Sequence, residues 1–140
     1  MGPTDVDIIR VFTREAKRNV ADVTIGEDKD LEIVLEAEAG GAVHSQAGAY
    51  SVGIVVKDID DGSSFVVNPI GTNPAGKVSG HFRDIDWPAQ DAKFVFTVDK
   101  AEVAKHTDHH CQVHAHVYFG FVDRDASLAV SPEFVVVPVP

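Results

Sequence analysis

Five of the seven histidines of the chain and its only cysteine lie in the stretch KHTDHHCQVHAHVYFGF, which runs from Lys105 to Phe121. Neutral imidazole is a ligand of zinc, copper and nickel, whereas calcium and magnesium prefer oxygen. On an extended strand the side chains of His114 and His116 point to the same face about 6.6 Å apart, close enough for both to bind one ion. The stretch therefore contains part of a candidate metal site.

A complete site needs a third and a fourth ligand. These must come from the turn before the strand, which holds His106, His109 and His110, or from loops that hold His44 and His81. The candidate set that we take forward is His106, His110, His114 and His116. Zinc is the expected ion of this set, with copper and nickel as alternatives.

A β-strand with one solvent-facing side explains the same stretch without a metal, and we prefer this interpretation. Alternation places the histidines of the strand on the exposed face with Gln112 and Tyr118, and places Cys111, Val113, Ala115, Val117, Phe119 and Phe121 on the buried face. Cys111 is then no ligand. A third interpretation is a pH switch, because clustered histidines gain charge and repel one another as the pH falls below about 6.5.

Other motifs predict no catalysis. The segment DIDDGS, which begins at Asp58, is similar to a calcium-binding loop, but its glycine comes one position early and the bidentate glutamate is absent. A hairpin turn explains it better. The serines lack a Gly-x-Ser-x-Gly nucleophile motif, and the chain has no phosphate-binding glycine loop. We therefore expect no enzymatic activity.

Trp87 stands in the polar segment DIDWPAQD. Its ring is either an exposed anchor for a partner or a cover that folds back over an edge of the sheet, and we favour the cover. Trp87 remains the candidate binding residue.

Composition limits the partners of the chain. With 22 acidic and 12 basic residues in 140, the formal charge is -10, which disfavours nucleic acid and anionic membranes. The sequence shows neither a signal peptide nor a run long enough to span a bilayer, so a cytoplasmic or virion-associated protein is the default expectation. A single cysteine cannot form an internal disulfide.

Apolar residues at period two predict seven to eight strands in residues 20–26, 30–40, 50–59, 64–70, 92–99, 111–122 and 127–137, with an ambiguous segment before residue 19. We expect a hairpin from 20–26 to 30–40 through a Gly-Glu-Asp turn, a second one around the Asp-Gly of DIDDGSS, and a third through DRDA at 123–126. Residues 40–49 and 71–80 are expected to be loops, and 99–106 a turn of helix or a loop.

This spacing of strands resembles the immunoglobulin and fibronectin type III superfold over residues 20–137. The resemblance implies an all-β, antiparallel immunoglobulin-like β-sandwich, and it assigns no functional residue because this superfold carries many unrelated functions. We expect residues 1–19 to form an N-terminal arm or edge strand and residues 20–140 a single sandwich domain.

The function that fits these features best is a non-enzymatic structural or protein-interaction module in a larger assembly, including a homo-oligomer. The apolar C-terminal run EFVVVPVP suggests a strand, Phe134 to Val137, that a partner covers. The alternative function is a metal-binding protein that uses the histidine-rich strand.

Overall fold

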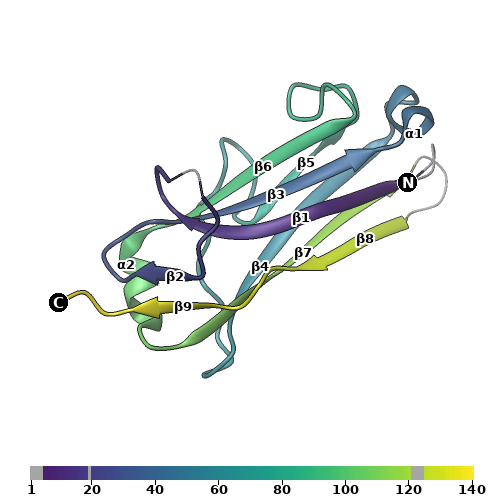
Figure 1. Ribbon diagram of the computed structural model, residues 1–140. Coiled ribbons are helices and arrows are strands. Elements are labelled where there is room, and N and C mark those ends of the chain that lie inside the picture. The colour runs from purple at the N-terminus through teal and green to yellow at the C-terminus, as the bar shows by residue number, and fades with distance from the viewer. Residues whose placement is uncertain (1–4, 19, 121–124) are drawn as a thin grey trace.

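The computed structural model describes residues 5–18, 20–120 and 125–140 and shows two β-sheets packed face to face (Figure 1). The smaller sheet has the order β1 (Val6–Glu15), β3 (Leu31–Ala39), β6 (Asp91–Val98). The larger sheet has the order β2 (Thr24–Gly26), β9 (Phe134–Val137), β7 (His110–Gly120), β4 (Ala49–Asp58), β5 (Lys77–His81), with β8 (Asp125–Val130) also paired to β7.

The predicted all-β sandwich is confirmed. The described residues contain nine strands, one more than the upper count expected, and every pair of strands is antiparallel except β2 with β9. Helical structure is limited to α1 (Gly41–Ser45), α2 (Lys100–Val103) and the 3-10 turn η1 (Ala104–His106). In the part of the chain that the structure describes, none of the helices has the length and apolar character that crossing a membrane requires.

Alternation determines which side chains fill the core. In β7 the residues at 111, 113, 115, 117 and 119 are buried, and the residues between them are exposed or partly exposed. The predicted burial of Cys111 is therefore confirmed. β4 follows the same rule, with Tyr50, Val52, Ile54 and Val56 in the core.

An aromatic group closes one open side of the sandwich. Trp87 lies between Tyr50, Phe82 and Phe94, with ring centroids 5.0 to 5.6 Å away, and its indole N–H donates to the Gln90 carbonyl oxygen at 2.9 Å. Its side chain is fully buried. Trp87 is therefore a core residue and cannot be the exposed anchor considered from the sequence.

The N-terminal segment forms an edge strand. β1 pairs with β3, and the cross-strand ion pairs Arg10–Glu36 at 2.7 Å and Arg14–Glu32 at 2.9 Å join the two strands. The basic residues of this segment thus find acidic partners within the same chain. Arg10–Glu36 is solvent-exposed and adds little stability, and both pairs favour this register of the two strands.

One expected hairpin is wrong and a second forms only in part. Residues 24–26 pair in parallel with β9, because the turn closed by the Lys29 N–H and the Gly26 carbonyl leads the chain from the larger sheet to the smaller one. The DIDDGSS turn reverses the chain as expected, but the antiparallel pairing after it is limited to the bridge between Ser64 and Lys57, and no second strand forms. Pro69 in this segment lacks the N–H that a continuing ladder requires.

Two expected loops contain regular structure. Residues 41–45 form α1, and β5 pairs with β4. Gly76 has a φ of 73°, which allows the chain to turn back, and its carbonyl accepts from the Ile54 N–H at 2.9 Å. The glycine and proline residues of 71–80 therefore did not prevent a short strand from beginning in this segment.

The C-terminal strand is covered by its own domain. Phe134 and Val136 are fully buried, and β9 lies between β2 and β7, so the expectation that a partner covers this strand is wrong. The pairing of β7 with β8 confirms the predicted C-terminal hairpin, although residues 121–124 of its turn lie outside the described residues.

Candidate functional site

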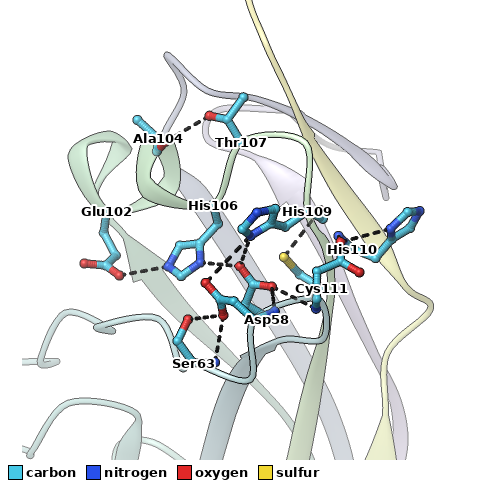
Figure 2. A network of polar contacts seen from close by, with 11 residues as sticks. Asp58, Ser63, Glu102, Ala104, His106, Thr107, His109, His110 and Cys111 are labelled. Carbon is cyan, nitrogen blue, oxygen red and sulfur yellow. Dashed lines mark hydrogen bonds and ion pairs between the residues drawn. The ribbon is translucent and has the colours of Figure 1, made fainter.

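A group of histidines and aspartates gathers where β4 ends and β7 begins (Figure 2). Asp58, Asp61, His106 and His109 each offer one ligating atom, and these four atoms all lie within 4.8 Å of one another. We call these four residues the Asp-His cluster. Of the ligands predicted from the sequence, only His106 belongs to it.

Asp58 is the centre of the Asp-His cluster. It continues the inward series of β4 beyond Val56, so its side chain points into the protein and is fully buried. Its Oδ2 contacts the Nδ1 of His106 at 2.7 Å and the Nδ1 of His109 at 2.5 Å. A charged group at a core-facing position therefore finds two imidazoles as partners, as buried carboxylates require.

A tight turn brings the two imidazoles to the same oxygen. The His109 N–H donates to the His106 carbonyl at 3.1 Å, and Asp108 between them has a φ of 68°. Aspartate tolerates this left-handed conformation better than most residues. The turn from His106 to His109, which follows η1, thus places two side chains that are three residues apart in the sequence against one carboxylate.

The DIDDGS turn supplies the carboxylates. Gly62 has a φ of 79°, and its N–H donates to the Asp58 carbonyl at 2.9 Å, which closes the turn. Asp61 Oδ1 accepts from the N–H of Ser63 at 2.8 Å and from its hydroxyl at 2.6 Å. Asp61 Oδ2 consequently faces His109 Nδ1 at 3.8 Å.

His106 is enclosed on all sides. Its ring stacks on Phe65 with centroids 3.8 Å apart, and its Nε2 contacts Glu102 Oε2 at 3.2 Å (Figure 2). Only a small fraction of its side chain is exposed, whereas the side chain of His109 is 34% exposed. The Asp-His cluster is thus open to solvent on the side of His109.

The contacts shift the pKa values of the cluster. Burial raises the pKa of Asp58, but hydrogen bonds from His106, His109 and the Asp61 N–H outweigh burial and lower this pKa to about 2. The hydrogen bond with Asp58 raises the pKa of His109 above its ordinary value. Hydrogen bonds from Ser63 lower the pKa of Asp61. The carboxylates of the cluster are therefore held in the charged form.

The remaining predicted histidines lie outside the cluster. His110 contacts Asp60 Oδ2 through its N–H at 2.8 Å and through Nδ1 at 3.3 Å. His114 is exposed on the outer face of the larger sheet, opposite Val55 and Val130. His116 lies against Gly53 and stacks on Tyr118 with centroids 4.3 Å apart. Within the described residues, these three histidines join no group of metal-ligating side chains.

The outer face of the larger sheet carries an exposed apolar strip. Leu128 is 75% exposed and Val130 55% exposed, and with His114, Ala115 and Ala129 they line an open hollow of about 400 Å³. Val55 and Tyr118 on the neighbouring strands extend the strip and are also exposed. Apart from Asp125 at the start of β8, the exposed positions of β4, β5, β7 and β8 hold no carboxylate, although the chain carries a net charge of -10.

Comparisons with known proteins support the fold and assign no family. No protein-family model matches the chain, and no curated protein matches it in sequence. One similar structure is AggA, the major subunit of aggregative adherence fimbriae type I from Escherichia coli. It has a TM-score of 0.55 and 8% identity, and the match covers 95% of this chain and 96% of that chain.

A second similar structure is the C-terminal domain of Wzt, with a TM-score of 0.48 and 11% identity over 100% of this chain and 75% of that chain. At 8% identity the likeness to AggA concerns the fold alone, and it agrees with the β-sandwich of the structure.

Proposed function

We propose that the chain is a non-enzymatic structural module that associates with further copies of itself through the outer face of its larger sheet. The observation that carries this proposal is the apolar strip of Leu128, Val130, Val55 and Tyr118. Contiguous exposed apolar side chains mark interaction surfaces on folded proteins. Leu128 and Val130 lie on the same strand as alternate outward residues and so present a continuous edge to the strip.

A second copy is the partner that charge favours. Two chains of net charge -10 repel each other over most orientations. The outer face of the larger sheet weakens this repulsion because, apart from Asp125 at the start of β8, its exposed strand positions hold lysine, histidine and neutral residues. The two-fold symmetry of most homodimers brings the same face of both copies together.

The likeness to a fimbrial subunit supports a role in assembly only by analogy. The absence of a legible catalytic motif in the sequence agrees with a structural role. The alternative function, metal binding by the histidine-rich region, rests on a different set of residues and is developed below.

The proposal is tested by sedimentation velocity over a wide range of protein concentration. We expect the parent chain to form dimers or larger species and Leu128→Asp to sediment as a monomer, because a carboxylate in a desolvated apolar contact is costly. Ile85→Asp is the matched control, since Ile85 is 92% exposed and lies away from the strip in the loop between β5 and β6.

Both variants change a solvent-facing side chain, so their folding free energies should stay within about 0.5 kcal/mol of the parent. A parent chain that remains monomeric at the highest concentration contradicts the proposal. Equal loss of association in Leu128→Asp and Ile85→Asp contradicts it as well, because the effect would then come from added charge alone.

A further inference from the structure

The four ligating atoms of the Asp-His cluster all lie within 4.8 Å of one another, and we call the space between them the shared point. Tetrahedral zinc with bonds of about 2.0 to 2.1 Å separates its ligand atoms by about 3.3 Å. The contacts of Asp58 Oδ2 with the two imidazoles are 2.7 and 2.5 Å, and Asp61 Oδ2 is 3.8 Å from His109 Nδ1. Each of these three separations differs from the value for zinc by less than about 1 Å, so small side-chain movements would bring these three contacts to the spacing that zinc requires.

Three of the four ligands are held from behind by a second polar group. Asp58 Oδ1 accepts from the N–H groups of Asp60 and Asp61 at 3.0 and 3.1 Å. Asp61 Oδ1 accepts from Ser63. His106 Nε2 faces Glu102 Oε2. Each of these contacts leaves the other oxygen or nitrogen directed toward the shared point, and such outer contacts are the common support of metal ligands.

The count of protons at His106 points to a cation. A neutral imidazole has one N–H and one lone pair. Both ring nitrogens of His106 face carboxylate oxygens, Nε2 toward Glu102 and Nδ1 toward Asp58. With the N–H on Nε2, Glu102 accepts it and the Nδ1 lone pair faces the anionic Asp58 oxygen; with the N–H on Nδ1, Asp58 accepts it and the Nε2 lone pair faces Glu102. In either tautomer one further positive centre, a proton or a metal ion, satisfies the carboxylate that faces the lone pair.

The charge of the surroundings favours a divalent ion. Asp58, Asp61 and Glu102 lie around two imidazoles, and Asp60 lies close by on His110. A bound divalent cation is commonly the largest local charge of a protein site, and carboxylates around it offset that charge. Two imidazoles among the ligands favour zinc, copper or nickel over calcium, which needs six to eight oxygens.

We propose that Asp58, Asp61, His106 and His109 bind one divalent transition-metal ion of the zinc type. Glu102 is the positioning residue that orients His106 for binding through Nδ1. The site differs from a pair of histidines on the exposed strand, since it excludes His114 and His116. Cys111 is also excluded, because its buried Sγ contacts the His109 carbonyl at 3.7 Å and not the shared point (Figure 2).

Isothermal titration calorimetry of the full chain with zinc sulfate tests the proposal. We expect one zinc ion per chain and an increase in the thermal midpoint with zinc, because a ligand that binds only the folded state stabilises it. His109→Ala should lower the zinc affinity at least 10-fold. Loss of an outer-shell partner alone lowers metal affinity 10-fold to 100-fold, and His109 is a direct ligand in the proposed site. His110→Ala is the matched control, because His110 is the next residue in the chain and lies outside the cluster.

A second pair of variants keeps the test valid if His109→Ala folds poorly. Asp61→Asn preserves the acceptor for Ser63 and removes the charge of a ligand, so it should lower the affinity about 10-fold. Asp60→Asn removes an equal charge from the neighbouring residue and should stay within about threefold of the parent.

Three outcomes overturn the proposal. The first is that zinc, copper and nickel all fail to bind in a stoichiometric ratio. The second is that His109→Ala and His110→Ala change the zinc affinity equally. The third is that the double variant His114→Ala/His116→Ala loses zinc binding while His109→Ala retains it. The first would show that protons alone hold the cluster together. Zinc binding by Leu128→Asp separates this proposal from the proposed self-association, because a monomeric variant should bind zinc as the parent does.

Discussion

The two halves of the histidine-rich stretch have opposite surroundings. In the first half, His106 and His109 turn toward the buried Asp58 and lie among carboxylates. In the second half, His116 lies over Gly53, and the charged group that acts on it is Lys77. Burial and Lys77 lower the pKa of His116, whereas the contact with Asp58 raises the pKa of His109.

The spacing of histidines along one strand therefore did not identify the side chains that contact them. The His-x-His pair has the spacing of a metal site but receives no third ligand from the neighbouring strands. The earlier histidines lack such a regular spacing, yet the end of β4 and the DIDDGS turn bring two carboxylates to them. The fold therefore places carboxylates beside the first half of the stretch, which makes that half the candidate for binding a cation.

Removal of the central carboxylate is the change with the largest expected effect. In the metal-free protein, Asp58→Ala leaves two imidazoles and the N–H groups of Asp60 and Asp61 without their acceptor. Loss of one partner from a buried charged network costs about 3 kcal/mol. Denaturant unfolding measures this loss in the free energy of unfolding.

Asp60→Ala is the control for that measurement, because it removes an exposed carboxylate two residues away. We expect the free energy of unfolding of Asp60→Ala to stay close to that of the parent. A cost for Asp58→Ala as small as that for Asp60→Ala would contradict the central position of Asp58 in the cluster.

The next largest expected effect is the difference between the pKa values of His109 and His116. In metal-free protein, NMR titration should place the midpoint of His109 above 6.5 and that of His116 below it. The raised pKa of His109 means that its contact with Asp58 stabilises the fold below pH 6.5 and is lost as the pH rises through the folded pKa. The lowered pKa of His116 gives the opposite pH dependence. Its contribution to the free energy of unfolding is lost as the pH falls below 6.5.

Gly53→Ala isolates the cause at His116. A methyl group at this position would overlap the His116 ring, which must then move away from the sheet into solvent. We expect the midpoint of His116 to rise toward 6.5 while that of His109 stays unchanged. A variant that leaves the His116 midpoint in place would show that burial against Gly53 is not what lowers this pKa.

The sandwich could be predicted from the sequence because apolar and polar residues alternate clearly in most of its strands, a pattern that fits a strand and not a helix. Cys111 and its inward neighbours followed from period two alone, and the C-terminal hairpin followed from two such patterns in succession. The hairpin expected between residues 20–26 and 30–40 was wrong because turn residues mark where the chain reverses but do not determine whether the next strand joins the same sheet or the opposite one.

The Asp-His cluster was missed for a related reason. Its ligands come from two segments about fifty residues apart, and no local spacing joins them. One signal was present in the sequence, since Asp58 occupies the next inward position after Tyr50, Val52, Ile54 and Val56. A carboxylate on the buried face of a strand requires a cationic or hydrogen-bonding partner. That requirement would have directed attention from His114 and His116 to the end of β4.

The most direct test of the central claim is NMR of the imidazole nitrogens of the histidine-labelled protein during a zinc titration. The account predicts that Nδ1 of His106 and Nδ1 of His109 change to the metal-bound form at one equivalent of zinc, while the ring nitrogens of His114 and His116 keep their metal-free signals. Metal-bound signals from His114 and His116, or unchanged signals from His106 and His109 at saturating zinc, would contradict it.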